Sequence, residues 1–270
     1  MPDRDTTVLA DPVAASLSGP HAHLARRHGR AASYLAEVAS FSTVTAHPEP
    51  GAWDDLVELL GVDAFADLFS CPALPPAHWV PEFTLDGHQF VHTGRTPALP
   101  RTAAEVVELG PADVPEMLDL VERTRPGPFR PRTRELGTYL GIRENGALVA
   151  MAGERLRPPG WTEISAVCTA PEARGRGHAA TLVTTLVHHI TARHDHPSST
   201  PPPPTPRPSP STNASASPTT PTSPSAATAR PERRDRRGSG ARHTPVGGIL
   251  CRSGPLRSPE DRTFLSDTRT

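Results

Sequence analysis

Apolar residues recur along the first hundred positions at spacings typical of short helices and strands. From these spacings we predict helices over residues 20–38, 53–60 and 64–69 and strands over residues 79–84 and 89–93. The two strands flank Asp86-Gly87, a dipeptide typical of a hairpin turn. Residues 1–20 have no such spacing, and we expect them to form a loose arm.

A second set of elements follows an expected linker at residues 97–104. We predict a strand over residues 105–109, helices over 111–124 and 133–141, paired strands within 142–156 and a further strand over 162–169. Asn145-Gly146 is the strongest short-range hairpin signal and joins the paired strands. A last helix is predicted from residue 180, because its apolar residues fall on one helical face: Leu182, Val183, Leu186, Val187 and Ile190.

The turn at residues 174–179, between the last strand and the last helix, has the chemistry of an anion site. Gly175 and Gly177 permit a sharp turn and a close approach of the backbone to a ligand. The amides that follow are the unpaired donors of a helix N-terminus, and Arg174 and Arg176 add positive charge. The expected ligand is a pyrophosphate. The turn is not a P-loop, because no Lys-Ser/Thr follows its second glycine, and it lacks the third glycine of the dinucleotide-binding fingerprint.

This strand, turn and helix resemble the coenzyme A motif of the GNAT (GCN5-related N-acetyltransferase) superfamily. The signature of that family is Gln/Arg-x-x-Gly-x-Gly/Ala, and here it is Arg174-x-x-Gly177-x-Ala179, preceded by Val167 and Pro171. The flanking residues look most like the glycine N-acyltransferase-like branch. The resemblance implies an α/β (α+β) fold with a mixed central sheet flanked by helices. The alternative is an arginine- and glycine-rich surface turn in some other α/β protein.

The resemblance also implies an acyl-CoA site and a reaction. The cofactor-binding residues would be Ala166, Val167, Cys168 and Thr169 of the strand and Arg174, Gly175, Arg176, Gly177, His178 and Ala179 of the turn. Backbone amides near Val167 and Thr169 would polarise the thioester carbonyl of acetyl-CoA, and a small-molecule or peptide amine would attack it. Glu163 is the candidate base; the alternative is that it is a solvent-facing strand carboxylate.

Three regions are expected. Residues 1–100 form a mixed α/β region that resembles a degenerate half of the same fold, and residues 101–194 form the acyl-CoA-binding domain. Residues 195–270 are expected to supply none of the C-terminal strands and helix of a GNAT domain. Of these 76 residues, 38 are Pro, Ser or Thr, so the segment lacks the apolar area to offset chain entropy and is predicted to be disordered.

The composition of residues 195–270 also has a second interpretation, a shifted reading frame. Codons for Phe-Leu-His-Ala-Ala-Ala-Ala-Asn-Thr, read one nucleotide late, give the sequence of residues 198–206. Codons for Ile-Pro-Leu-Tyr-Glu-Arg-Leu-Gly-Phe give that of residues 209–217 in the same way. Both hidden segments resemble the C-terminal signature of the GNAT family, whose helix often supplies the tyrosine that protonates the leaving thiolate. The hypothesis is a frameshift in the gene, or a sequencing error, near residues 193–197, and we expect the chain as written to fold incompletely or to have little activity.

Charge and cysteine content bear on two questions: whether the chain binds nucleic acid and whether it has disulfide bonds. The net charge of −1 combines 17 Arg and 23 acidic residues in 1–194 with 11 Arg and 6 acidic residues in 195–270, and no lysine occurs. We attribute this all-arginine basicity to a GC-rich coding sequence, and we predict no nucleic-acid partner. Three widely spaced cysteines do not form a disulfide framework, and Cys168 is interpreted as a small apolar residue of a buried strand.

We predict a cytoplasmic, soluble chain without a metal. The first residues lack the pattern of a signal peptide, and no apolar run approaches the roughly 18 residues of a membrane span. His21, His23 and His28 are expected to be solvated or capping residues, because i,i+2 spacing does not place His21 and His23 on one helical face. The oligomeric state is left open.

A second class of function is a non-catalytic, CoA-binding or regulatory module with an interaction tail. Residues 201–210 could offer a polyproline II segment to a partner domain. Residues 230–237 could contact an anionic surface, although two acidic residues interrupt them and no aromatic residue accompanies them.

Overall fold

The computed structural model of the chain describes residues 5–45, 49, 51–92, 96–99, 104–200 and 241–253. The strands are β1 Ala25–His28, β2 Ala31–Tyr34, β3 Ser42–Val44, β4 Phe65–Phe69, β5 Trp79–His92, β6 Val106–Glu108, β7 Tyr139–Glu144, β8 Ala147–Glu154, β9 Trp161–Thr169, β10 His196–Ser199 and β11 Ala241–Ser253. The helices are α1 Pro12–Ser18, α2 Ala52–Leu60, α3 Val114–Thr124 and α4 His178–Ala192. Short 3-10 turns are η1 Thr7–Leu9, η2 Ala22–Leu24, η3 Pro111–Asp113, η4 Thr133–Leu136 and η5 Pro171–Ala173.

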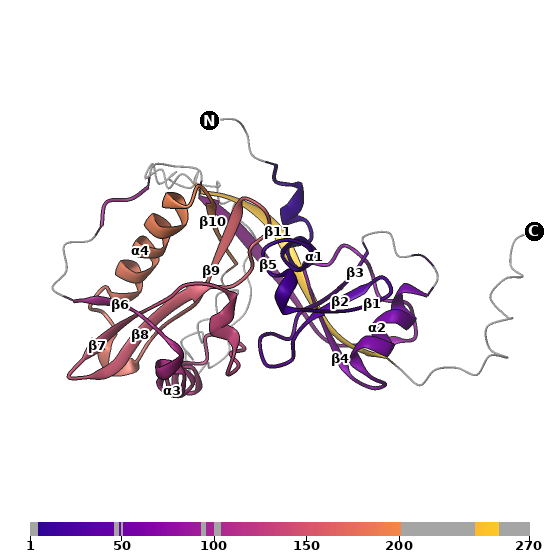
Figure 1. Cartoon of the computed structure of the whole chain (residues 1–270), viewed down its shortest axis with the longest axis horizontal. Helices are drawn as coiled ribbons and strands as arrows, with labels where there is room; N and C mark the ends of the chain where they lie inside the picture. The colour runs from indigo at the N-terminus through magenta and orange to yellow at the C-terminus, as the bar shows by residue number, and fades with distance from the viewer. Residues whose placement is uncertain are drawn as a thin grey trace, which may run out of the picture.

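The described strands form two sheets that share the N-terminal part of the molecule. The smaller sheet has the order β1-β2-β3, and the larger one has the order β4-β11-β5-β10-β9-β8-β7-β6. In Figure 1 the long strands β5 and β11 run from the C-terminal part, with α3 and α4, to the N-terminal part, with α2 and the small sheet. The larger sheet therefore joins two regions that the sequence separates by a linker.

The C-terminal part agrees with the sequence prediction of a mixed sheet flanked by helices. Strands β6 to β9 are successive antiparallel neighbours, and both α3 and α4 pack against β8 and β9. The predicted hairpin is confirmed: Asn145 and Gly146 have φ angles of 50° and 84°, which an Asn-Gly pair adopts readily. Of the predicted helix over 133–141, only η4 forms, and β7 begins at Tyr139.

The N-terminal part differs from the prediction in three places. The predicted helix over 20–38 is instead the hairpin of β1 and β2, which turns at Gly29 with a φ of 49°. The predicted helix over 64–69 is β4, and the expected loose arm contains α1, whose Val13 and Leu17 are completely buried. Strand pairing and burial determine the secondary structure of these segments, because an alanine-rich composition only weakly favours a helix.

Two further predictions fail because partner strands come from the end of the chain. The expected hairpin at Asp86-Gly87 does not form, because β5 continues through it and pairs with β11 along its whole length. Residues 195–270 were expected to supply no strand, yet they contribute β10 and β11 to the larger sheet. The disorder predicted for the rest of that segment, including 201–210 and 230–237, falls outside the described residues.

His21 links the two parts of the molecule and is not solvated. Its Nδ1 lies 2.8 Å from the Tyr34 hydroxyl and its Nε2 lies 2.9 Å from the Leu136 carbonyl oxygen. Burial lowers the pKa of His21 to about 4, and the hydrogen bond to Leu136 opposes the shift. The prediction is therefore wrong for His21, whereas His23 and His28 are exposed.

Two features, a metal-ion cluster and a membrane-spanning helix, are absent from the described residues. No group of three or more His, Cys, Asp or Glu side chains is arranged to hold a metal ion. In the same part of the chain, every helix is too short or too polar to cross a lipid bilayer.

Candidate functional site

Strand β9 has a free edge that begins at its centre. Its first four residues, Trp161 to Ile164, pair in parallel with β10 from His196 to Ser199. Beyond Ile164, no described strand pairs with this edge, and the opposite pairing with β8 changes register between Met151 and Gly153. Ala166 adopts a φ of 52° at this bulge. A bulge bends the strand and disrupts the ladder locally, and the described strand β10 ends at Ser199, opposite Ile164.

The amides of this free edge point away from β8. Ala170 N–H donates to the Val149 carbonyl oxygen of the β8 side at 2.8 Å. Because N–H directions alternate along a strand, the Thr169 and Val167 amides face the opposite, unpaired edge. These are the two donors that the sequence predicts for a thioester carbonyl.

The turn at residues 174–179 presents a second set of open amides. Gly175 and Gly177 both have a φ of 81°, and a Cβ built on either would meet nothing within 4 Å. Helix α4 begins at His178, and its first internal acceptor is the Gly177 carbonyl oxygen, which receives the Thr181 N–H at 3.0 Å. The first amides of α4 therefore have no acceptor among the described residues, and they form the positive end of a 15-residue helix.

Side chains around this turn are held by ionic contacts. Arg176 Nη1 donates to Glu144 Oε2 at 2.6 Å, and His178 Nε2 lies 3.0 Å from Glu144 Oε1. The bonds from His178 and then Arg176 hold the pKa of Glu144 below its ordinary value. Arg174 Nε donates to the Thr169 carbonyl oxygen at 3.3 Å and is otherwise exposed. The turn thus keeps both arginines at the surface beside the open amides.

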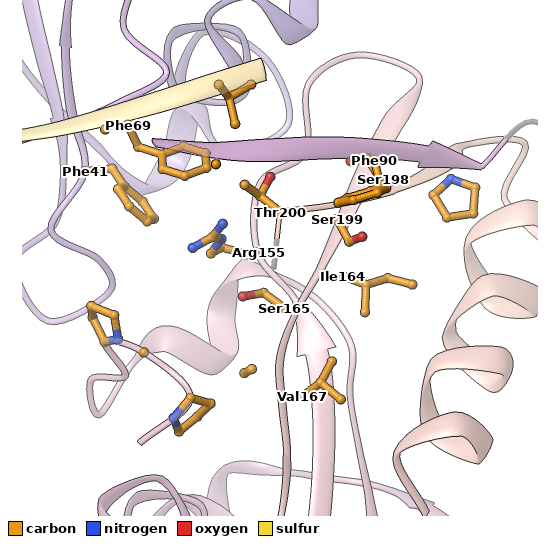
Figure 2. Close-up of a pocket in the computed structure, with 18 of the residues that line it drawn as sticks. Phe41, Phe69, Phe90, Arg155, Ile164, Ser165, Val167, Ser198, Ser199 and Thr200 are labelled. Carbon is orange, nitrogen blue, oxygen red and sulfur yellow. The ribbon is translucent and has the colours of Figure 1, made fainter. Parts of the chain in front are cut away.

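A cavity of about 790 Å³ opens along the free edge of β9. One end is lined by the β9 bulge and by α4, through Ala166, Val167, Val183 and Val187. Figure 2 shows the other end, where Phe41 and Phe69 of the N-terminal part face Arg155, with Ser165 and Val167 on β9 below them. A cavity of this size lies within the range of small-molecule sites in proteins.

Arg155 and Glu163 form a buried ion pair at the border of this cavity. Arg155 Nε and Nη2 donate to the two Glu163 carboxylate oxygens at 2.8 and 2.7 Å. The guanidinium carbon lies 4.8 Å from the ring centre of Phe69 and 5.2 Å from that of Phe41. The pair is thus held between β9 and the aromatic residues of the N-terminal part.

This geometry bears on the predicted role of Glu163. Its side chain is 3% exposed, so the alternative of a solvent-facing carboxylate is wrong. Both of its oxygens accept from Arg155, and it does not line the cavity, an arrangement that does not favour proton abstraction. Its role as base stays a prediction.

Asp67 is the carboxylate that does line the cavity. It lies on β4, and its Oδ2 accepts a hydrogen bond of 2.6 Å from the Ser40 hydroxyl. Burial raises the pKa of Asp67 above its ordinary value, and the hydrogen bond from Ser40 opposes this shift. Its Oδ1 has no hydrogen-bond partner in the part of the chain that the structure describes.

The predicted cofactor-binding residues fall into three groups. Ala166 and Val167 line the cavity; the turn residues lie outside it, and of these 174–177 are exposed whereas His178 is buried. Cys168 is buried in the core, with its thiol near Met151 of β8 and Thr124 of α3, which agrees with its interpretation as a small apolar residue. Burial raises the pKa of its thiol, so a thiolate is disfavoured.

Sequence reasoning missed the wall that contains Phe41, Asp67, Phe69 and Arg155. One signal was available in residues 65–69, Phe-Ala-Asp-Leu-Phe, where Ala66 and Leu68 alternate with the other three. That period-2 pattern is typical of a half-buried strand with Asp67 and Phe69 on one face. Nothing local, however, indicates that this face meets β9.

Comparisons with known proteins cover most of the chain. A model of the FR47-like protein family matches residues 139–200. Among solved structures, an acetyltransferase from the GNAT family of Novosphingobium aromaticivorans DSM 12444 is 31% identical, with a TM-score of 0.69, over 91% of this chain and 98% of its own. A GCN5-related N-acetyltransferase from Kribbella flavida is 16% identical, with a TM-score of 0.56, over 94% of this chain and 98% of its own. No curated protein matches the chain.

Proposed function

The chain belongs to the GNAT family of acetyltransferases, and from this premise we propose that it moves an acetyl group from acetyl-CoA to an amine. The observation that carries the proposal is that two groups of amides have no acceptor among the described residues: those of Val167 and Thr169 at the edge of β9, and the first amides of α4. Backbone donors in this order suit a ligand with a carbonyl group at one end and a diphosphate at the other.

Each part of the chain has a separate task in this proposal. The amides of Val167 and Thr169 bind the thioester oxygen and stabilise the negative charge that develops on it during attack. The amides after Gly177 bind the diphosphate, and Arg174 and Arg176 add charge that is screened by salt. Helix α4 and the β9 bulge line the channel between them through Val167, Val183 and Val187.

The glycine N-acyltransferase-like branch remains part of the proposal, as does a cytoplasmic location. A non-catalytic CoA-binding module is less well supported. The cavity continues past the β9 edge to a wall with Asp67 and Arg155, and a protein that only binds CoA has no need of such a wall.

We also propose that the reading frame is shifted near residues 193–197. Strand β10 lies between β9 and β5, and β11 lies between β5 and β4, yet they contain Pro197 and Pro245. Proline cannot donate to a ladder and is confined to edge strands or bulges, and buried parallel strands are normally rich in Val, Ile and Leu. Ser198 and Ser199 border the cavity, and in the hypothesised frame these positions would be Phe and Leu.

The coding DNA tests the shifted frame directly, because the other frame must encode the tyrosine-bearing segment. Function is tested by acetyl transfer to a panel of amines, measured on this chain and on the frame-restored chain. We expect turnover by the restored chain and little or none by this one. A restored chain that binds no CoA would overturn the acyltransferase proposal, and robust turnover by the present chain would overturn the shifted frame.

A further inference from the structure

The far wall of the cavity carries one carboxylate among aromatic rings. Asp67 and Phe69 come from β4, Phe41 precedes β3, and a parallel bridge joins Phe41 to Asp67. We propose that this wall is the acceptor site, and that it selects a primary ammonium carried on an aromatic-sized apolar group, with Asp67 as the residue that pairs with the ammonium. The inference rests on the proposed acetyl transfer and names its acceptor class.

The wall has one carboxylate that forms no ion pair among the described residues, that of Asp67. Three of the described lining residues are titratable: Asp67, His92 and Arg155. The Arg155 charge is balanced by Glu163, since both carboxylate oxygens accept from that guanidinium. Arg155 and then Arg130 lower the pKa of Asp67 through their charge; Arg155 is hydrogen-bonded to Glu163 rather than to Asp67, and Arg130 is exposed, so its field is screened by solvent. The Asp67 carboxylate is therefore the charge at this wall that a ligand can match, and its Oδ1 is free to accept a hydrogen bond.

The aromatic residues determine the shape and polarity of the ligand that fits this wall. Phe41 and Phe69 lie with ring centres 5.4 Å apart, and Phe83 and Phe90 also line the cavity. The Arg155 guanidinium already lies over Phe41 and Phe69, and the remaining ring surfaces can pack against a flat apolar group. An anionic acceptor would instead have to desolvate beside Asp67 without a free cation, because Arg155 is already paired.

Calorimetric titration with three probes of one shape tests this inference: 2-phenylethylamine, 2-phenylethanol and 3-phenylpropanoate. The amine is protonated at pH 7, because alkyl ammonium groups have pKa values near 10. We expect the chain to bind the amine about tenfold more tightly than the alcohol, and the carboxylate least, since charge-assisted hydrogen bonds are worth roughly 1.5–3 kcal/mol.

Asp67→Asn should remove the preference for the amine, because the amide keeps the size and the Ser40 hydrogen bond but not the charge. Asp63→Asn is the matched control: it makes the same charge change outside the cavity, at a position with a φ of 60° that Asn tolerates. Equal binding of amine and alcohol by the unaltered chain would overturn the inference without relying on any variant. An unchanged preference in Asp67→Asn would overturn it as well.

A CoA titration of the same samples separates this inference from the proposed function. CoA binding without an Asp67-dependent amine preference overturns only the acceptor class. A chain and a frame-restored chain that both give no heat with CoA overturn the acetyl-transfer proposal, whatever the amine result.

Discussion

The two proposed binding sites are built in different ways. The proposed CoA site, or CoA end, is made of main-chain amides on one continuous strand, turn and helix, residues 161–192. The proposed acceptor site, or acceptor end, is made of side chains from separate segments, among them Phe41, Asp67, Phe69 and Arg155. A site made of amides depends on backbone geometry and a few glycines, whereas a site made of side chains depends on how distant segments pack. Variants that act on one end only, or on the junction between the ends, test this division.

The largest effect is expected where the two ends meet, at the Arg155–Glu163 pair. Glu163→Gln leaves the Arg155 guanidinium buried without its counter-charge, and we expect a loss of about 3–5 kcal/mol in the free energy of unfolding. Urea denaturation measures it. The double variant Arg155→Met with Glu163→Gln should recover most of the loss. Unchanged stability combined with lost turnover in Glu163→Gln would restore Glu163 as the base.

The next effect is expected at His21, which joins the N-terminal part to η4. The pKa of His21 is about 4 in the folded protein and 6.5 ordinarily. Between these two pH values the unfolded chain binds a proton at His21 and the folded chain does not. Stability should therefore fall as the pH decreases from 6.5 toward 4, with a loss of about 2 kcal/mol between pH 7 and pH 5. Urea unfolding at both pH values measures the loss. His21→Gln should lack this pH-dependent loss of stability. An equal loss in the variant would show that His21 is not its source.

Gly177→Val acts on the CoA end alone. A β-branched residue at a φ of 81° is strained by about 1–2 kcal/mol and brings a side chain beside the open amides. We expect CoA affinity to fall at least about tenfold, while binding of 2-phenylethylamine is unchanged.

Gly51→Val is the matched control for this variant. Gly51 occupies the same N-cap position on α2, with a φ of 95° and nothing within 4 Å of its Cβ, but it belongs to the N-terminal part and not to the turn at residues 174–179. It should cost similar stability without changing CoA affinity. Equal CoA affinity in both variants would mean that the turn does not bind the diphosphate.

The smallest effect is expected from Glu144→Gln. Glu144 is a surface carboxylate that engages Arg176 at 2.6 Å, and its loss frees that arginine to face the ligand. CoA should bind about twofold more tightly at low salt and show no difference at high salt, because exposed ion pairs are weak and screened. Titrations at two ionic strengths measure this difference, and weaker binding in the variant would contradict the expected role of Arg176.

The sequence could predict the CoA end because its determinants are local. The glycines at 175 and 177, the apolar face of α4 and the Asn145-Gly146 hairpin each act within a few residues, and the structure has the strand, turn and helix in that order. Even the start of α4 differs by only two residues from the predicted one. The resemblance to the GNAT family then indicated which ligand to expect, namely CoA.

The acceptor end could not be predicted, because its determinants are long-range. The Asp86-Gly87 signal was overridden by β11, which pairs with β5 across sequence separations of 149 to 174 residues. Glu163 was recognised as a carboxylate on the right strand, but only the fold brings Arg155 against it. Phe41 likewise reaches Asp67 through packing that no periodicity encodes.

The most direct test of the central proposal compares CoA with pantetheine, which lacks the diphosphate, in calorimetric titrations of this chain and the frame-restored chain. We predict that CoA binds at least about tenfold more tightly than pantetheine, and that Gly177→Val abolishes this difference. Equal affinities for the two ligands, or no heat with CoA in either chain, would contradict the assignment of the turn at residues 174–179 as the diphosphate site.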